Sequence, residues 1–566
     1  MIIETRSGSR YHYDVRSNRI NVAEDNKLQE SIVPVVFDEV KPISALPNID
    51  TFVIEFTQQC NMRCTYCCYG GSYEGNRTHS SKIMAEAVLS STIDFIKKNK
   101  VQDRKLTVVL YGGEPLTRFS TIIEYVKRIK SEFDDVDIVI STNGLLLESE
   151  QKVQWLIEQG IYLNVSLDGM EKFHDESRKD INGNPTFVRV HSNLSKIRET
   201  DKAYFMSHVN LLVCVSRLEH LLPISEFWGR DSLLRDKAPY LISGISRCSI
   251  EDYNLDVSEA LTALHGLMDF YASNRNNVFA RTYFAQIVDP IIDRNIFDLE
   301  PKLTPLACLP YNNRCFIDCD GNIGVCEKTA DIFRIGTLER GWDFDVIRNA
   351  IESLANVKRF RCASCENLRF CQMCFTNHGF DEKRWDADCE WQKKWERISI
   401  TIALEMVEEN LIYSEDASKC SLRPIVENDK AALYRLMSNS NIVRYLDGVQ
   451  IPDDFEDFLR FFLLISEINA SFAHPTLLAI VDEMSDLIGV VGIDDIIDDV
   501  ANLFFLLEDG HWGNGIMTAM LAEYLERYVP KDVNRITTHI NPDNKAALAL
   551  MSKFETIEVD TSPYTF

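Results

Sequence analysis

The stretch CNMRCTYCCYGG, residues 60–71, decides the fold of the first half of the chain. It places four cysteines within nine positions, directly after the compact apolar run TFVIEFT at 51–57. The first three, Cys60, Cys64 and Cys67, have the spacing C-x3-C-x2-C. A four-iron cluster needs four thiolates for full ligation, so three thiolates on one loop leave one iron open. The stretch therefore predicts an iron–sulfur site with an open position, just past a buried strand.

A zinc loop is the alternative interpretation of these cysteines. A closed zinc site uses four tetrahedral ligands, commonly paired as C-x2-C. The C-x3-C-x2-C spacing after an apolar strand favours the iron–sulfur interpretation. The fourth cysteine, Cys68, lies outside the pattern, and we expect it to be half-buried and to bind no metal.

From residue 51 to about 250, strand-like and helix-like segments alternate, which is typical of parallel β/α units. About six units fit this range. The expected strands are 51–57, 106–115, 137–144, 162–169, 205–215 and 240–246, and the expected helices are 81–98, 121–133, 148–160 and 187–198, followed by a helical region at 255–300. Four successive strands end in TQQCNMRC, YGGEP, STNG and SLDG. Because the carboxyl ends of the strands form the active face of β/α barrels, we expect these residues to meet at one mouth.

The composition limits the class of protein. A length of 566 residues predicts about three or four domains. No segment reaches the roughly 18 apolar residues of a membrane helix, and the N-terminus lacks the apolar core of a signal peptide. We therefore expect a cytoplasmic protein without a membrane partner. The net charge of −26 disfavours nucleic acid and is compatible with a cationic peptide or a small molecule.

The sixteen cysteines are unevenly distributed. Four lie at 60–68 and nine at 308–389, and only Cys214, Cys248 and Cys420 lie elsewhere. In a reducing compartment, clustered cysteines favour metal binding or catalysis over disulfides. The scarcity of cysteine after residue 420 indicates a domain boundary near that point.

The run CNMRCTYC, followed by GGEP at 112–115, resembles the radical SAM superfamily. The resemblance implies a partial (β/α)6 barrel with a 4Fe-4S cluster on Cys60, Cys64 and Cys67. It also implies that the open iron binds S-adenosyl-L-methionine (SAM), whose reductive cleavage gives a 5′-deoxyadenosyl radical that abstracts a substrate hydrogen. An electron donor such as flavodoxin or ferredoxin is implied as a partner.

The same resemblance implies a set of SAM-contacting residues at or just past the strand ends: Tyr66, Gly112, Gly113, Glu114, Ser141, Asn143, Ser166 and Arg178. The aromatic residue would pack near the adenine, and the GGE loop would receive the methionine amino group. The STNG segment would contact the ribose. Ser166 and Arg178 would hold the carboxylate, which suits an arginine fork. The alternative for Arg178 is a surface ion pair.

The second cysteine field has the pattern C-x12-G-x4-C, then C-x2-C-x5-C-x2-C, then C. It resembles the SPASM extension of peptide-modifying radical SAM enzymes, although the last spacing of the second block is two instead of three. The resemblance implies two auxiliary 4Fe-4S clusters, and so three clusters in the chain. The ligands of auxiliary cluster I would be Cys308, Cys326, Cys374 and either Cys315 or an open iron, with Cys319 a weaker candidate. Those of auxiliary cluster II would be Cys362, Cys365, Cys371 and Cys389. A zinc ribbon is the alternative.

The stretch CLPYNNRCFIDCDGNIGVCEKTADIFRIGTLERG at 308–341 looks like maturases of ribosomally synthesised peptides. Those enzymes install cross-links such as thioether or carbon–carbon bonds, and related ones epimerise residues. A small ribosomal precursor peptide is therefore the expected partner, held in part by an added strand on the N-terminal β segment. Anaerobic sulfatase maturases, which act on folded proteins, share the architecture and are the alternative.

From residue 420 the segments read as strand, helix, two paired strands, then two strand–helix units. The glycine loop WGNGIM at 512–517 lies between a strand and a helix, where backbone N–H groups favour an anion. This order resembles GNAT acetyltransferases, especially the type that acetylates protein N-termini. The implied acetyl-CoA contacts are Gly513, Asn514, Gly515, Met517, Asn541 and Asn544. Two departures, a methionine in place of a small residue and only about a dozen residues after Phe554, leave a trimmed, inactive binding module as the alternative.

These patterns predict an α/β protein in modules. They are an N-terminal β segment (1–50), a radical SAM barrel (51–300), a SPASM-like cluster domain (301–400), a helical linker (401–419) and an α+β GNAT-like domain (420–566).

Overall fold

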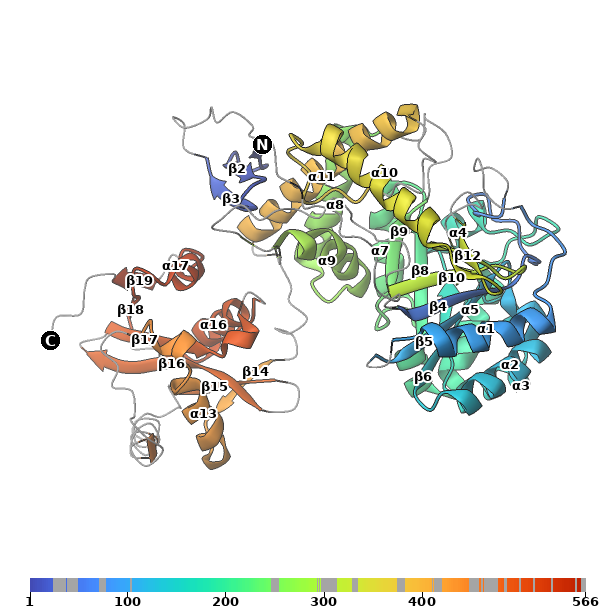
Figure 1. The fold of residues 1–566 in the computed structure, drawn as a ribbon. Helices are drawn as coiled ribbons and strands as arrows, with labels where there is room; N and C mark the ends of the chain where they lie inside the picture. Colours follow the sequence, from blue (N-terminus) through green and yellow to red (C-terminus); the bar gives the residue numbers. More distant parts are fainter. Residues whose placement is uncertain are drawn as a thin grey trace. The chain divides into compact units, whose positions relative to one another are not determined.

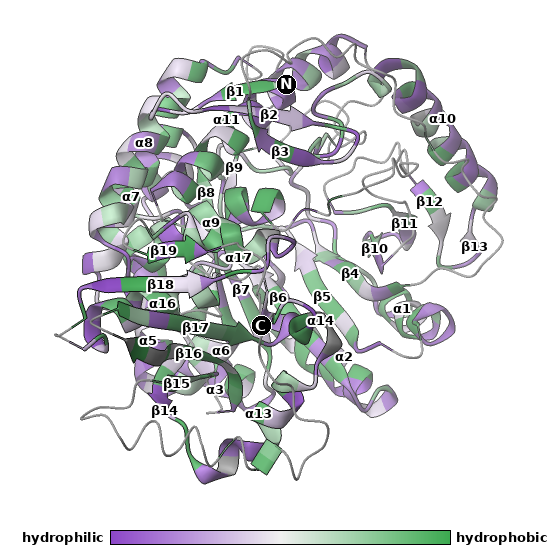
Figure 2. Cartoon of the chain, turned by 90° about the vertical axis from the view of Figure 1, so that its left-hand side faces the viewer, coloured by the Kyte–Doolittle hydropathy of each residue, from purple (hydrophilic) through white to green (hydrophobic). Residues whose placement is uncertain are grey.

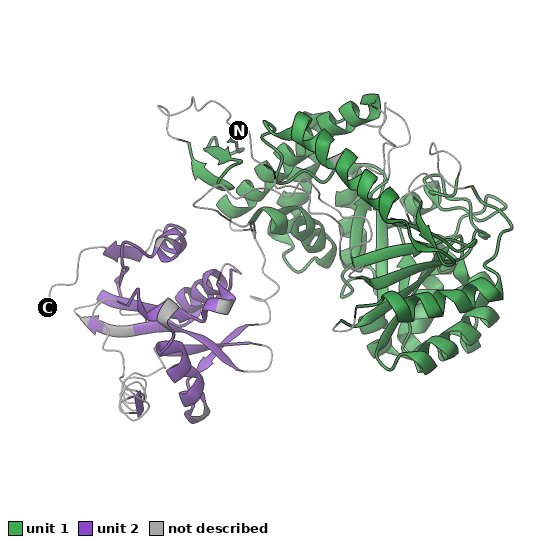
Figure 3. Ribbon diagram, viewed as in Figure 1, with its two compact units in different colours: residues 1–411 green, residues 412–566 purple. Residues whose placement is uncertain are grey.

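The computed structural model divides the chain into two compact units, Met1–Leu411 and Ile412–Phe566 (Figure 3). It describes all residues except 24–36, 38–48, 71–77, 102–103, 246–253, 293, 295, 297–312, 328–333, 374–381, 410, 412–419, 447–457, 460–461, 463–476, 483–485, 498–499, 513–514, 531–532, 555–556 and 561–566. Among the described residues, none of the helices combines the length and the apolar character that crossing a membrane requires.

Six parallel strands form the centre of the first unit (Figure 1). They are β4 (Ile49–Thr57), β5 (Leu106–Gly112), β6 (Val136–Thr142), β7 (Tyr162–Ser166), β8 (Val209–Val215) and β9 (Leu241–Gly244). Each strand pairs in parallel with the next one along the chain. Buried and half-buried residues alternate strictly along β8, as expected for a strand covered by helices on one side only. The predicted α/β class and the partial (β/α)6 barrel are confirmed.

Helices connect these strands and cover the sheet. They are α1 (Glu86–Asn99), α2 (Phe119–Glu132), α3 (Glu150–Glu158), α4 (Glu171–Ser177), α5 (Phe187–Thr200), α6 (Lys202–His208), α7 (Leu221–Arg230), α8 (Val257–Ser273) and α9 (Val278–Ile292). In α2, the buried residues Ile122, Val126 and Ile129 follow the helical period. The strand expected at 205–215 begins only at Val209, because the Asp201 side chain caps α6 by accepting a hydrogen bond from the Tyr204 backbone N–H.

The cysteine-rich region extends the barrel sheet. Strand β10 (Asn313–Ile317) pairs in parallel with β4, and β11 (Asn322–Gly324), β12 (Arg334–Thr337) and β13 (Gly341–Trp342) continue antiparallel to a sheet of ten strands. Two long helices follow, α10 (Phe344–Cys362) and α11 (Glu382–Glu408). The helix predicted near 391–411 therefore begins earlier, at Glu382, and its residues 398–406 are buried.

The N-terminal segment forms a separate antiparallel sheet of β1 (Ile2–Glu4), β2 (Arg10–Asp14) and β3 (Arg19–Val22). Strand β2 confirms the strand expected at YHYDV. The second expected strand, SIVPVVF at 31–37, lies outside the described residues except for Phe37. The backbone N–H of Arg6, in the turn between β1 and β2, donates to Glu405 of α11 at 2.7 Å and anchors this sheet to that helix.

The second unit is a six-stranded sheet with helices. Its elements are β14 (Ser421–Pro424), α13 (Lys430–Met437), α14 (Ser440–Val443), β15 (Leu477–Val481), β16 (Leu487–Ile497), β17 (Val500–Leu507), α16 (Ile516–Arg527), β18 (Arg535–His539), α17 (Lys545–Met551) and β19 (Ile557–Asp560). Strands β14 to β17 are antiparallel, whereas β17, β18 and β19 are parallel. Figure 2 shows that β16 and β17 are largely hydrophobic. This order confirms the predicted α+β domain, in which one further strand follows α17.

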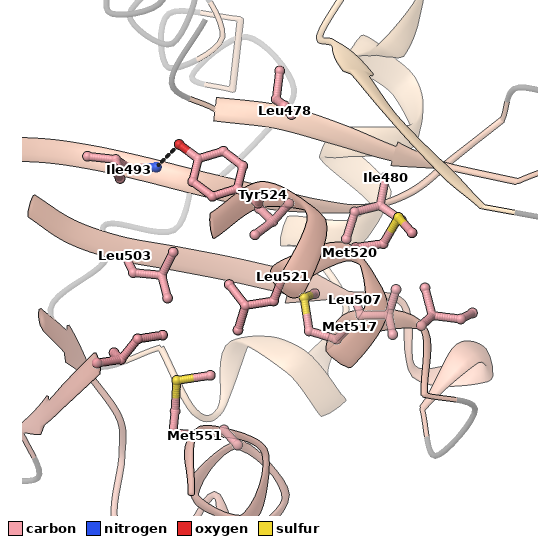
Figure 4. Close-up of a cluster of buried hydrophobic side chains, with 14 of the residues drawn as sticks. Leu478, Ile480, Ile493, Leu503, Leu507, Met517, Met520, Leu521, Tyr524 and Met551 are labelled. Atoms are coloured by element: carbon pink, nitrogen blue, oxygen red, sulfur yellow. Dashed lines mark hydrogen bonds between the residues drawn. The ribbon is translucent and has the colours of Figure 1, made fainter. Parts of the chain in front are cut away.

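The core of the second unit lies between this sheet and α16 (Figure 4). Tyr524 of α16 is fully buried, and its hydroxyl accepts a hydrogen bond from the Ile493 backbone N–H at 3.1 Å. Met517, Met520 and Leu521 fill the same core.

Candidate active site

The loop after β4 presents the three predicted cluster cysteines, all half-buried. Each sulfur accepts at least one N–H donor: Cys60 Sγ from Met62 N at 3.4 Å and Asn143 Nδ2 at 3.8 Å, Cys64 Sγ from Arg178 Nη1 at 3.9 Å, and Cys67 Sγ from Tyr69 N at 3.4 Å. Hydrogen bonds to the sulfurs are a main means by which proteins stabilise and tune iron–sulfur clusters. The donor set of this loop therefore fits such a cluster.

The thiols of this loop have raised pKa values. Burial raises the pKa of Cys60 to about 11 and that of Cys64 above its usual range. For Cys67, the hydrogen bond with the neighbouring Cys68 thiol contributes most to the rise, and burial adds to it. Because a metal-bound thiol is deprotonated, binding an iron cluster here releases protons. Cys68 is half-buried, as predicted, and its Sγ lies 3.9 Å from the hydroxyl of Tyr111.

Two glycines at the end of β5 allow two loops to cross closely. A Cβ on Gly112, whose φ is +137°, would lie 2.1 Å from the carbonyl oxygen of Thr57. A Cβ on Gly113 would lie 2.3 Å from the carbonyl oxygen of Gln59. The backbone N–H groups of Gly113 and Glu114 donate to these same two carbonyls, each at 2.8 Å. The glycine pair thus fixes the start of the cysteine loop, a structural role in addition to the SAM contact that the resemblance implies.

Glu114 is completely buried and joins the ends of β5 and β6. Its carboxylate accepts hydrogen bonds from the backbone N–H groups of Leu116 and Asn143 at 3.0 and 2.7 Å, and from the Thr142 hydroxyl at 2.9 Å. Burial raises the pKa of Glu114 to about 7 in spite of these donors. The side chain therefore positions the neighbouring strand ends, and its contact with SAM stays a prediction.

Asn143, just past the end of β6, contacts the cysteine loop directly. Its Nδ2 donates to Asn61 Oδ1 at 2.8 Å and lies 3.8 Å from Cys60 Sγ. Its Oδ1 accepts from the Leu145 backbone N–H at 3.1 Å. Ser141, the next-to-last residue of β6, is half-buried. The structure therefore brings the ends of β4, β5 and β6 together, as the mouth of a barrel requires.

Arg178 is buried beside this mouth, so its ion pair is not a surface contact. Its Nε donates to Asp168 Oδ2 at 2.8 Å, and its guanidinium lies 5.4 Å from the centre of the Tyr66 ring. The Tyr66 hydroxyl donates to the same carboxylate oxygen, and the Cys214 backbone N–H donates to the other one at 3.0 Å. Asp168 thus binds three different segments, while Ser166 lies half-buried at the end of β7.

A buried histidine, His174, holds the backbone of Asp168 in place. The Asp168 backbone N–H donates to His174 Nδ1 at 3.2 Å, so the ring hydrogen lies on Nε2, which faces the Thr186 hydroxyl at 3.1 Å. That hydroxyl donates to the carbonyl of Arg178 at 2.7 Å. Burial lowers the pKa of His174 to about 4. Sequence reasoning missed Asp168 and His174; the available signal was the acidic residue inside SLDG, two positions after Ser166.

The inner part of the second cysteine field is attached to β4. Cys315 is fully buried on β10, beside Phe52 in register. Cys319 donates from its Sγ to the carbonyl of Glu55 at 3.2 Å and from its backbone N–H to the Glu55 carboxylate at 3.1 Å. The other carboxylate oxygen of Glu55 accepts from the hydroxyl of Tyr69, in the first cysteine loop, at 2.6 Å. Cys326 is half-buried. The other two predicted ligands, Cys308 and Cys374, lie outside the described residues.

The outer part of the field gathers around the end of α10. Cys362 closes that helix, Cys365 and Cys371 follow in the next turns, and Cys389 lies on α11. Burial raises the pKa of each of these thiols, and the Cys362 thiol adds to the rise at Cys371 and Cys389. The four predicted ligands therefore lie in one neighbourhood. Across the residues that the structure describes, no three His, Cys, Asp or Glu side chains converge on a point suited to a single metal ion.

In the second unit, the backbone pairing of two neighbouring strands ends early. Strands β17 and β18 pair only from Val500 to Asn502, although β17 continues to Leu507. Past this point, the Trp512 indole donates to the carbonyl of Leu507 at 2.7 Å. Gly515, with φ of +69°, precedes α16.

The other predicted acetyl-CoA residues have structural contacts of their own. The Met517 side chain is buried in the core of the unit. Asn544 caps α17 by accepting from the Ala547 backbone N–H at 3.1 Å, and Asn541 accepts from the Asp543 backbone N–H at 2.8 Å. Gly513 and Asn514 lie outside the described residues.

Comparison with known families gives two matches. The model of the radical SAM superfamily matches residues 54–213, and the model of the acetyltransferase (GNAT) domain matches residues 420–555. These matches confirm that a radical SAM domain and a GNAT domain are combined in one chain.

Known proteins similar to this chain include anaerobic sulfatase-maturating enzymes. The cysteine-type enzyme of Clostridium novyi (strain NT) is 24% identical over 337 residues, which cover 56% of this chain and 84% of that protein. The serine-type enzyme of Bacteroides thetaiotaomicron is 30% identical over 146 residues, 25% of this chain and 34% of that protein. Among solved structures, native anSMEcpe with bound AdoMet is 19% identical, with a TM-score of 0.48, over 64% of this chain and 100% of that one.

Proposed function

We propose that this radical SAM chain modifies a ribosomally synthesised peptide in the cytoplasm, by forming a cross-link such as a thioether or carbon–carbon bond or by epimerising a residue. The main observation is the loop after β4, where the sulfurs of Cys60, Cys64 and Cys67 each accept at least one N–H donor, whereas Cys68 lies outside the C-x3-C-x2-C spacing. This arrangement suits a cluster with one open iron at the mouth of the barrel.

The residues of the mouth have distinct tasks in this proposal. Cys60, Cys64 and Cys67 would hold the cluster, which together with SAM supplies a 5′-deoxyadenosyl radical for hydrogen abstraction. Arg178 keeps N–H donors beyond those used by Asp168 and Cys64, and these would bind the SAM carboxylate. Tyr66, held by Asp168, would lie against the adenine. The carboxylate of Glu114, just past β5, holds the end of β6 through Thr142 and Asn143.

The second cysteine field would hold two auxiliary clusters with the ligands named above. The hydrogen bonds of Glu55 to Cys319 and to Tyr69 support a common role of the two fields, because one buried carboxylate fixes both. The peptide substrate is supported by the resemblance of 308–341 to peptide maturases. A second candidate function is maturation of a folded protein, which the similarity to sulfatase-maturating enzymes favours.

We also propose that the GNAT domain binds acetyl-CoA and acetylates the product or its N-terminus. This proposal is supported by the end of the β17–β18 backbone pairing at Asn502 and by Gly515 at the N-terminus of α16. Backbone N–H groups at that helix terminus would face the pyrophosphate. If the domain binds peptide alone, titration of the full chain with acetyl-CoA will release no heat and no acetyl group will be transferred.

The central test is anaerobic reconstitution of the full chain. Three 4Fe-4S clusters require about twelve irons per chain. With SAM and dithionite, 5′-deoxyadenosine is expected, and its absence would exclude radical chemistry. A precursor peptide encoded beside the gene is then compared with a sulfatase-derived peptide. Loss of hydrogen or uptake of solvent deuterium by the precursor alone supports the peptide function, and reaction of the sulfatase peptide alone supports the second candidate. The Cys67→Ser variant is the inactive control.

A further inference from the structure

Two neighbouring strands of the barrel carry a pair of carboxamides. Asn210 Nδ2 on β8 donates to Asn164 Oδ1 on β7 at 3.0 Å, and the two residues lie opposite each other in register. Both are half-buried, whereas the adjacent residues Leu163 and Leu211 are completely buried. Because successive side chains of a strand point to opposite faces, the carboxamides lie on the face that the helices leave uncovered. We call it the inner face.

The pair continues a row that starts at a predicted SAM contact. Ser141 of β6 is in register with Asn164, which is in register with Asn210. Residues in register on parallel strands face the same side of the sheet, and neighbouring strands are about 4.8 Å apart. The two carboxamides therefore lie one and two strand spacings from Ser141, the residue that the resemblance places next to the ribose of SAM.

The bond between the two side chains uses only part of each carboxamide. A carboxamide has two N–H donors on its nitrogen and two lone pairs on its oxygen. The Asn164 Nδ2 and the Asn210 Oδ1 form no hydrogen bond with any residue that the structure describes, and neither atom is sealed off from solvent. One donor group and one acceptor therefore remain side by side on the inner face for a ligand.

The surroundings of the pair favour an uncharged ligand. The other half-buried residues of these two strands carry no charge at neutral pH: Tyr162, Ser166, Leu212 and Cys214. At the mouth, Asp168 and Arg178 are paired with each other at 2.8 Å. A charged group at the carboxamides would lose hydration without gaining a counter-ion, whereas an amide would satisfy the free donor and the free acceptor together.

We propose that Asn164 and Asn210 bind a neutral amide group of the peptide substrate and thereby select the residue that faces the radical. This inference rests on the proposed function. The N–H of the ligand donates to Asn210 Oδ1, and its carbonyl accepts from Asn164 Nδ2. The N–H and C=O of one extended peptide residue point to the same side and offer this pair, as does the side-chain carboxamide of asparagine or glutamine.

The test compares an inner-face variant with a matched control in the full chain. The inner-face variant is Asn164→Leu with Asn210→Leu, which keeps the approximate side-chain volume. The control is Gln154→Leu with Asn274→Leu, which removes two exposed carboxamides that donate to Glu158 and to the Phe270 carbonyl. The probe is a synthetic core of the precursor peptide encoded beside the gene. Its binding is measured by calorimetry, and its modification is followed with SAM and dithionite.

We expect the inner-face variant to bind the peptide at least tenfold more weakly and to have an at least tenfold higher KM for it, with the control within twofold of the unmodified chain. SAM affinity, iron content and 5′-deoxyadenosine formation without peptide should be unchanged. A pair that only stabilises the sheet would lower the resistance to urea and leave peptide binding within twofold, and this result would overturn the proposal. An equal loss of SAM affinity would also overturn it. If the leucine variant does not fold, Asn164→Ser with Asn210→Ser decides by the same measurements.

Two altered peptides identify the source of the amide. One has leucine in place of its asparagine and glutamine residues, and the other has an ester in place of the backbone amide of the modified residue. The alteration that weakens binding to the unmodified chain, but not to the inner-face variant, marks the ligand. Undiminished binding of both peptides overturns the proposal, as does the absence of peptide binding. If the unmodified chain makes no 5′-deoxyadenosine with dithionite, the proposed function fails, while calorimetry still decides the amide site.

Discussion

The guanidinium of Arg178 and the carboxylate of Asp168 form an ion pair inside the barrel mouth, with 2.8 Å between Nε and Oδ2 and exposed fractions of 9% and 2%. The same carboxylate accepts the Tyr66 hydroxyl, and Arg178 reaches Cys64 Sγ. One buried acid thus orients the two residues predicted to hold the two ends of SAM, Tyr66 and Arg178, and Arg178 also contacts a cluster thiol. Removing one partner of a buried pair leaves an uncompensated charge, which typically costs about 3–5 kcal/mol.

The Asp168→Asn variant should therefore bind SAM at least tenfold more weakly, because Arg178 and Tyr66 lose their common acceptor. Calorimetric titration of the reconstituted chain measures this affinity. The matched control is Asp236→Asn, which breaks a partly exposed pair with Arg198 and should change SAM affinity by less than about twofold. Equal SAM affinity in the two variants would show that Asp168 does not position the site.

The close crossing at Gly113 predicts a strong effect of a single methyl group. In the Gly113→Ala variant the new Cβ would lie 2.3 Å from the Gln59 carbonyl oxygen, and the cysteine loop must move. We expect a loss of about 1–3 kcal/mol in the free energy of unfolding and a lower iron content. Gly244→Ala at the end of β9 is the control, because a Cβ there meets no atom within 4 Å. Urea unfolding and iron analysis test both variants. Equal stability and equal iron content in the two variants would show that the close contact of Gly113 with Gln59 does not constrain the cysteine loop.

The two adjacent thiols Cys67 and Cys68 should differ sharply. Replacing Cys67 with Ser removes a predicted ligand, so one of three clusters should be lost and iron should fall by about one third. The Cys68→Ser variant should retain its iron and its production of 5′-deoxyadenosine. Iron and sulfide analysis after anaerobic reconstitution measures this difference. If the Cys68→Ser variant also loses a third of its iron, the prediction that Cys68 binds no metal is wrong.

His174 predicts how stability depends on pH. Its pKa falls from 6.5 to about 4 on folding, so the unfolded chain binds more protons between these values and stability rises with pH there. The contribution is complete above pH 6.5 and is lost as the pH falls toward 4, by about 3 kcal/mol at ~1.4 kcal/mol per unit. Glu114 acts in the opposite direction, because its pKa rises to about 7 on folding.

The comparison of His174→Asn with the unmodified chain isolates the histidine from this opposing group. Urea unfolding of the metal-free chain between pH 4.5 and 7 should give a smaller gain in stability with rising pH for the variant. Parallel curves for the two proteins would show that His174 does not remain neutral in the fold.

The positions of the mouth residues could be predicted because parallel strands end at one edge of a sheet. The motifs around Cys60, Gly112, Asn143 and Ser166 each follow an apolar strand, and the structure places those strands side by side. Their local partners could not be predicted. Glycine near a cofactor suggests ligand access, yet the cause of the Gly112–Gly113 pair is the carbonyl of a loop more than fifty residues earlier.

Asp168 and Glu55, whose roles the sequence does not predict, form hydrogen bonds with residues that are distant in the sequence. Asp168 accepts from Tyr66 across 102 positions, and Glu55 accepts from Cys319 across 264 positions. No local pattern marks a carboxylate whose role is to be buried between such segments. For the same reason the strand expected at 205–215 starts before the observed one: residues 205–208 belong to the helix that Asp201 caps, although their apolar side chains are equally compatible with a strand.

The parallel pairing of β10 with β4 has a consequence for dividing the chain. Without residues beyond 312, the first strand of the barrel would expose a row of unpaired backbone groups at the border of the sheet. A barrel produced alone should therefore self-associate through β4, and the two cysteine fields cannot be exchanged between proteins as independent cassettes. Strand β4, which precedes the first field, and strand β10, which contains Cys315, belong to one continuous sheet and should be expressed and engineered together.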